Sequence, residues 1–149
     1  MKVYADSSFL VALYLQEPHS DAAAAFMRSH GRALPLTPWH RLEVRNAIRL
    51  AVFHGLIDSR QARTQLKQLD TDLREETLAV HAPVDWVTVL RRAEQLGAAH
   101  NDMIGCRSSD LFHIAAAVEM EAELFLTYDA RQKKMAQAAG LKAVISEGR

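Results

Sequence analysis

The chain has 149 residues, the size of one ordinary domain, and 49% of them are hydrophobic against 24% charged. This composition excludes a disordered or low-complexity chain. The 18 basic and 18 acidic side chains cancel, so the net charge does not point to nucleic acid, although a local basic patch suffices for phosphate contact. We therefore predict one globular domain spanning residues 1–149.

The cysteine content and the N-terminal sequence bear on where the protein works. Cys106 is the single cysteine, so no internal disulfide can form, and a reducing cytoplasm is expected. The N-terminal residues show no charged lead followed by a long apolar segment. The longest apolar run there, Phe9 to Leu15, falls far short of the ~20 residues that span a bilayer. We expect a soluble cytoplasmic protein without a membrane segment.

The chain begins with a short buried strand from Val3 that runs directly into a helix, with Asp6 at the junction. Ligands of open α/β sheets collect beyond the carboxyl ends of the strands, which makes this a favoured position for a functional acid. A purely structural role also fits, because Asp6, Ser7 or Ser8 can cap the helix. Both interpretations of Asp6 stay open at this point.

A second short strand is predicted at residues 33–37, and Pro38 opens a long helix that reaches His54. Glu43 lies at the edge of the apolar stripe of this helix, so it is either an exposed partner of a nearby arginine or a member of a site. The helix also carries a basic row, which is either a solvated face or a contact for an RNA backbone: Arg41, Arg45 and Arg49.

Residues 58–76 form a polar amphipathic helix that we interpret as packing or partner surface, and residues 78–80 form a third strand. Asp85 caps the next helix, whose end at Gly97 to Gly105 carries His100, Asn101 and Asp102. We predict a polar helix terminus or loop there rather than a metal site.

Residues 108–118 form a helix that is apolar on nearly every side, yet it carries Asp110 in its first turn. A buried carboxylate is costly unless a cation or several hydrogen-bond donors receive it. His113 lies one turn further on and is expected to be a buried hydrogen-bonding residue rather than a catalytic group.

A fourth buried strand at residues 123–127 is followed at once by Asp129 and a helix over residues 130–139, and residues 142–145 form a last strand. Asp129 and Gln132 fit a capping box, which would explain Asp129 structurally. The position nevertheless repeats that of Asp6, a carboxylate at the end of a strand that begins a helix.

Alternating short strands and helices favour a parallel sheet covered on both faces. Asp6 and Asp129 would then lie close together, with Glu43 and Asp110 leaning in from the sides. Four carboxylates at one edge repel one another unless a divalent cation neutralises them. Carboxylate oxygens and retained waters suit Mg²⁺ or Mn²⁺ rather than zinc, and such an ion can generate hydroxide and neutralise charge in phosphodiester hydrolysis.

Several motifs occur in a recognisable order along almost the whole chain: YADSS at residues 4–8, LEVRN at 42–46, DLFHIA at 110–115, TYD at 127–129, and then residues 136–141. With these motifs the sequence resembles PIN-domain nucleases, in particular the VapC-type toxins of bacterial toxin–antitoxin pairs.

The resemblance implies a three-layer α/β/α Rossmann-like domain with a central, mostly parallel sheet. It also implies a Mg²⁺- or Mn²⁺-dependent endoribonuclease that forms homodimers and is blocked by a cognate antitoxin. Ser8 and Thr127 match polar positions that support the acids. The catalytic and metal-binding residues would be Asp6, Glu43, Asp110 and Asp129.

The RNA target depends on surface shape and single-stranded loops, which no motif in the chain encodes. The candidate contacts to the RNA backbone are Arg45, Arg49, Arg107 and Lys133.

There are three alternatives to a toxin with ribonuclease activity. A signalling receiver domain would need paired acids after the first strand and a lysine after a late strand, and neither is present. A PIN-like scaffold that only binds protein and an RNA-processing nuclease without an antitoxin both remain compatible with the sequence.

Overall fold

The computed structural model describes residues 1–145, which form seven helices and five strands and divide into two compact units. The first unit consists of Met1–Asp6 and the described residues from Val84 onward, and the second unit is Ser7–Pro83. Among the described helices, none combines the length and apolar character that crossing a membrane requires.

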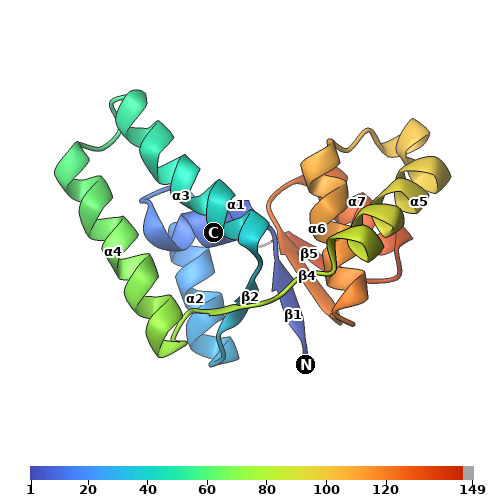
Figure 1. The fold of residues 1–149 in the computed structure, drawn as a ribbon, viewed down its shortest axis with the longest axis horizontal. Coiled ribbons are helices and arrows are strands. Elements are labelled where there is room, and N and C mark those ends of the chain that lie inside the picture. Colours follow the sequence, from blue (N-terminus) through green and yellow to red (C-terminus); the bar gives the residue numbers. More distant parts are fainter. Residues whose placement is uncertain (146–149) are drawn as a thin grey trace. The chain divides into compact units, whose positions relative to one another are not determined.

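The elements of the first unit are β1 (Val3–Ala5), α5 (Trp86–Ile104), α6 (Ser108–Glu119), β4 (Leu124–Thr127), α7 (Ala130–Ala138) and β5 (Lys142–Ile145). The three strands form a parallel sheet in the order β1-β4-β5 (Figure 1). Ala5 pairs with Leu126, so the carboxyl ends of β1 and β4 lie side by side. The rings of Tyr4 and Phe125 stack with centroids 5.8 Å apart and are fully buried.

The elements of the second unit are α1 (Ser7–Tyr14), α2 (Ser20–His30), β2 (Leu34–Leu36), α3 (Pro38–Phe53), α4 (Ser59–Glu75) and β3 (Ala79–His81). β2 and β3 pair in parallel. Thr37 begins α3 as a capping box with His40, and Pro38 occupies the first helical position, where its missing N–H costs nothing.

The prediction of an α/β fold with parallel strands is confirmed, and each of the five predicted strands is present within one or two residues of its expected place. Helix α5 continues through Gly97 to Ile104, and its C-cap is Gly105, whose φ of 78° is the left-handed conformation that glycine adopts most easily. A Cβ at Gly97 would lie 3.3 Å from Leu111 Cδ1, so the glycine permits close packing of α5 on α6. That residues 1–149 act as one domain stays a prediction.

A buried carboxylate that the sequence did not single out ties α1 to α4 in the second unit. The Tyr14 hydroxyl donates to Asp72 Oδ2 at 2.6 Å. Gln68 Nε2 and Thr77 Oγ1 donate to Asp72 Oδ1 at 2.9 and 3.0 Å. Asp72 therefore stabilises this unit, because three hydrogen-bond donors compensate for the burial of its negative charge.

The Tyr14 contact predicts a loss of stability in alkali. Burial, and then the hydrogen bond to the Asp72 carboxylate, raise the pKa of Tyr14 well above its ordinary value of 10.0. Because the folded pKa exceeds the unfolded one, this contribution to stability is complete below about pH 10 and falls by about 1.4 kcal/mol per pH unit above it. Urea unfolding at several pH values should therefore show a steeper alkaline loss in the wild type than in Tyr14→Phe. Identical pH dependence in the two proteins would contradict the assignment.

Candidate active site

The carboxyl ends of β1 and β4 bring Asp6 and Thr127 together. The Asp6 N–H donates to the Leu126 carbonyl at 3.0 Å and so continues the strand pairing by one residue. The Thr127 hydroxyl donates to Asp6 Oδ2 at 2.9 Å, and both side chains are 1% exposed. Strand pairing thus holds a buried carboxylate beside a hydroxyl donor, which fixes the orientation of one of its oxygens.

Asp129 joins the same group from the start of α7. Its backbone N–H donates to Thr127 Oγ1 at 3.0 Å. Its carboxylate accepts from the N–H groups of Arg131 and Gln132 at 2.8 and 3.1 Å, so Asp129 is the N-cap of α7. The predicted capping role of Asp129 is confirmed, and the same residue also contacts the hydroxyl that orients Asp6.

Asp110 enters from α6 and is 5% exposed. Oδ2 accepts from the Arg107 N–H at 3.0 Å, and Oδ1 accepts from Gln132 Nε2 at 2.8 Å. The sequence required a cation or hydrogen-bond donors for this buried carboxylate, and the structure supplies two donors. They give the buried charge of Asp110 a hydrogen-bond partner on each oxygen.

Gln132 is the contact that sequence reasoning missed. The capping-box interpretation predicts that its side chain turns back to the Asp129 backbone, and this part is wrong: the amide points to Asp110 and lies 3.3 Å from Thr127 Oγ1. The apolar neighbours of Asp110 on α6 were the one available signal, because a buried carboxylate needs a donor from another element.

Cys106 lies beside these acids and reports their charge. Burial, and then the negative charges of Asp110 and Asp129, raise the pKa of the Cys106 thiol to about 11, against an opposing effect of Arg131. The thiol itself lies 3.5 Å from the Arg131 carbonyl oxygen. The negative charges of Asp110 and Asp129 therefore both disfavour the thiolate of Cys106.

The charge at Asp110 predicts a measurable change in this thiol. Asp110→Asn removes one negative charge that disfavours the thiolate, so the pKa of Cys106 should fall from about 11. Alkylation by iodoacetamide as a function of pH measures the value, and Cys106 is the single cysteine of the chain. The exposed Asp102→Asn should leave the profile unchanged, whereas equal profiles for all three proteins would contradict the placement.

Glu43 belongs to the second unit, where it is half-buried on α3. Its Oε1 accepts from the Ser7 hydroxyl at 2.9 Å. Arg41 and Arg45 both reach Asp70, at 3.6 and 3.0 Å. Asp6, Asp110 and Asp129 are joined within the first unit, and the meeting of all four acids stays a prediction.

Thr127 and Ser8 are the two polar residues expected near the acids, and their positions in the structure differ. Thr127 donates a hydrogen bond to Asp6, and Ser8 is exposed at the start of α1. That either residue supports the acids of a functional site stays a prediction. His113 is 2% exposed and its Nδ1 lies 2.8 Å from the Tyr4 hydroxyl, which confirms a buried hydrogen-bonding residue. The Asn101 side chain makes two hydrogen bonds with the Cys106 backbone in the turn before α6. The end of α5 is therefore a helix terminus, as predicted.

The carboxylates fit a hard divalent cation in their chemistry. Asp6, Asp110 and Asp129 offer oxygen ligands only, and they are linked by hydrogen bonds through Thr127 and Gln132. Within residues 1–145, no group of three or more His, Cys, Asp or Glu side chains is arranged so that it could hold a metal ion. Mg²⁺ binds through one or two carboxylates and keeps several waters, so this donor set suits it.

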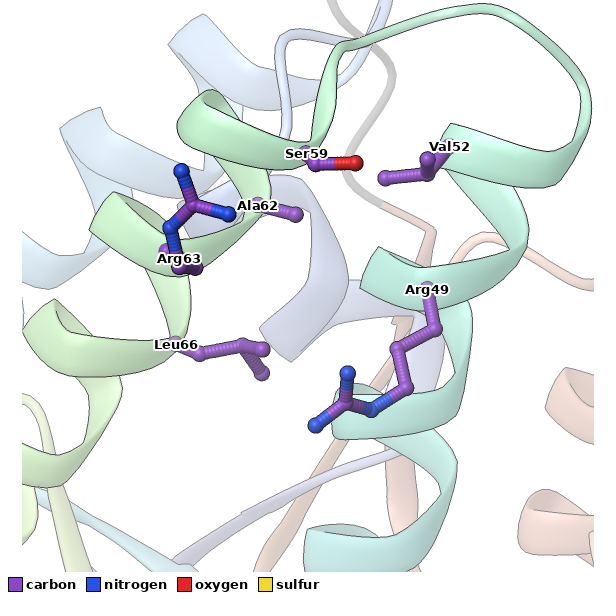
Figure 2. A pocket seen from close by; sticks show the side chains of 6 residues that line it. All are labelled: Arg49, Val52, Ser59, Ala62, Arg63 and Leu66. Atoms are coloured by element: carbon purple, nitrogen blue, oxygen red, sulfur yellow. The ribbon is translucent and has the colours of Figure 1, made fainter.

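The candidate RNA contacts lie in both units. Arg107 is highly exposed, with its Nε 3.7 Å from Asp110 Oδ2, and Lys133 is half-buried on α7. Arg45 is engaged with Asp70. Arg49 lines a groove of about 460 Å³ between α3 and α4 (Figure 2).

Figure 2 shows this groove from close by, with Arg49 and Val52 on α3 facing α4. Ala62 and Leu66 are buried residues of α4 and form the apolar part of its lining, while Arg63 of the same helix is exposed. The groove therefore combines apolar surface with two arginines.

Comparison with known proteins places these observations in a family. The family model "PIN domain" matches residues 3–138. The fold is similar to FitAcB from Neisseria gonorrhoeae, with a TM-score of 0.68, 12% identity and coverage of 97% of each chain. It is also similar to VapC20 of Mycobacterium tuberculosis, described as a sarcin–ricin loop cleaving toxin, with a TM-score of 0.67, 16% identity and coverage of 97% of this chain and 98% of that one. No curated protein sequence matches the chain. Because the family model covers most of its length, the chain belongs to the PIN domain family.

Proposed function

We propose that the protein is a Mg²⁺- or Mn²⁺-dependent endoribonuclease. PIN domains are generally nucleases, and the chain belongs to that family. The observation that carries the proposal is the hydrogen-bonded series Asp6–Thr127–Gln132–Asp110, with the Asp129 N–H on the same threonine. Buried carboxylates held in fixed positions suit cation binding, because the ligands need little reorganisation when the ion arrives.

The residues have separate tasks in this proposal. Asp6 and Asp110 would be direct ligands, while Asp129 and Glu43 would complete the site directly or through water. When bound, the cation would activate water and stabilise the charge that develops on the phosphate. Thr127 orients Asp6, and the Arg107 N–H orients Asp110, so both carboxylates keep one oxygen in a fixed direction. The exposed Arg107 side chain lies where it could also contact an RNA phosphate.

RNA cleavage by the purified, partner-free protein tests the proposal. Discrete fragments should appear with Mg²⁺ or Mn²⁺, disappear with EDTA and return when the metal is added back. Cleavage that is insensitive to EDTA would contradict a metal-dependent mechanism. Measured absence of both Mn²⁺ binding and cleavage would favour the protein-binding scaffold instead.

We further propose that the nuclease is a cytoplasmic toxin that works as a homodimer and is neutralised by an antitoxin. VapC20, which has a similar fold at 16% identity, is itself described as a toxin. The groove between α3 and α4 supports a protein partner, because apolar surface beside Arg49 and Arg63 suits a segment with apolar and acidic side chains. Growth arrest on expression, relieved by the product of a neighbouring gene, would distinguish this function from RNA processing without an antitoxin.

A further inference from the structure

We infer that Gln132 is a positioning residue of the acidic site, where its side-chain amide sets the orientation of the Asp110 carboxylate and joins it to the Thr127–Asp6 pair. The inference rests on the proposed metal-dependent function. Gln132 lies on α7, Asp110 on α6 and Thr127 at the end of β4, so one side chain connects three elements of the first unit.

The contacts of Gln132 are those of a buried connector. Its side chain is 6% exposed, and Nε2 donates to Asp110 Oδ1 at 2.8 Å. The orientation of the amide follows from this contact, since a carboxylate accepts hydrogen bonds and the NH₂ group must face it. The Gln132 oxygen then faces Thr127 Oγ1 at 3.3 Å.

Thr127 links Gln132 to Asp6, because its hydroxyl contacts both side chains. Its hydroxyl proton is shared between two acceptors, with the stronger hydrogen bond to the charged Asp6 Oδ2 at 2.9 Å and a weaker one to Gln132 Oε1 at 3.3 Å. The Asp129 N–H donates to the same hydroxyl oxygen at 3.0 Å. The position of Gln132 is therefore coupled to Asp110 directly and to the surroundings of Asp6 through Thr127.

For a cation site, the absence of charge on Gln132 is as important as its hydrogen bonds. A lysine or arginine at this position would neutralise the carboxylates and compete with a metal ion, whereas a glutamate would add another negative charge. An amide holds Asp110 by a hydrogen bond and leaves the negative charge of the acids available to a cation. Residues that hold metal ligands in this way typically change metal affinity or activity 10- to 100-fold when they are replaced.

Substitutions at Gln132 separate its hydrogen bonds from its packing. Gln132→Met keeps similar volume and removes both contacts. Gln132→Glu keeps the shape and an acceptor toward Thr127, but it cannot donate to Asp110 when ionised. The matched control is Gln137→Met, because Gln137 is an exposed residue of the same helix.

The readouts are the Mn²⁺ dissociation constant, measured by calorimetric titration of the metal-free protein, and the thermal midpoint without metal. Cleavage of RNA is followed in parallel, with kcat and KM separated. We expect the dissociation constant to rise about 10-fold or more in Gln132→Met and in Gln132→Glu, with lower kcat, and to be unchanged in Gln137→Met. Circular dichroism identifies a variant that fails to fold, in which case the other Gln132 variant decides.

Two contrary results have different meanings. Wild-type Mn²⁺ affinity in a folded Gln132→Met protein would overturn the positioning role while leaving the proposed nuclease intact. Absence of Mn²⁺ binding in the wild type would overturn the proposed function itself, and the inference with it.

Discussion

Asp110→Asn is expected to lower metal-dependent RNA cleavage by on the order of 100-fold or more while the protein stays folded. The substitution removes the negative charge proposed to hold the cation. It preserves the shape of a side chain that is 5% exposed, and its carbonyl can still accept from the Arg107 N–H. The Gln132 amide can rotate so that its oxygen receives the new NH₂ group. Single-turnover cleavage of one RNA, together with circular dichroism, measures both parts of the expectation.

The control for this experiment is Asp102→Asn, which removes an acid from the exposed end of α5 in the same unit. Its activity should equal that of the wild type. Wild-type cleavage in a folded Asp110→Asn protein would remove Asp110 from the catalytic set.

Asp72→Ala is expected to lower the free energy of unfolding by on the order of 3 kcal/mol. The substitution takes the acceptor from Tyr14, Gln68 and Thr77 at once. Gln68 and Thr77 are exposed and can turn to water, whereas the buried Tyr14 hydroxyl loses a charged partner at 2.6 Å. Most of the cost should therefore come from Tyr14, and urea unfolding measures it.

A double-mutant cycle isolates that contact. Tyr14→Phe alone leaves Asp72 with two donors and should cost about 1 kcal/mol. In the combined Tyr14→Phe, Asp72→Ala protein no buried hydroxyl is left unpaired, so the total loss should be smaller than the sum of the single losses. Additive losses would show that Tyr14 and Asp72 do not stabilise the unit through their mutual hydrogen bond.

The strands were predictable because their signals are local. Strands β1, β2 and β4 are short apolar runs that lie directly before a helix, and Thr37 and Asp129 cap the helices that follow β2 and β4. The parallel pairing followed from their alternation with helices, and the register of Ala5 with Leu126 then placed the two carboxyl ends together.

The connections between side chains were not predictable in the same way. Gln132 at the third position of α7 looks like a capping-box residue, and only the burial of Asp110 on another helix gives its amide a better partner. Asp72 reads as one more polar residue of an amphipathic helix, because Tyr14 lies 58 residues away in the chain. Contacts between residues that are far apart in the chain determine which polar residues are buried, and helical periodicity carries no information about such contacts.

The role of Glu43 does not follow from local sequence patterns alone. Its contact with Ser7, the residue after Asp6 in the chain, is an observation within the second unit. Its participation with Asp6 and Asp110 in one metal site remains a prediction based on the motif order. A Glu43→Gln protein with reduced Mn²⁺ affinity would support that participation, and unchanged affinity would contradict it.

Asp6 and Asp110 are proposed to hold a divalent cation together, and anomalous diffraction from a crystal of the wild-type protein soaked in Mn²⁺ would locate the ion. The predicted result is an anomalous peak within coordination distance of both carboxylates, absent from an Asp110→Asn crystal treated in the same way. Mn²⁺ bound elsewhere, with no peak at these two residues, would contradict the claim.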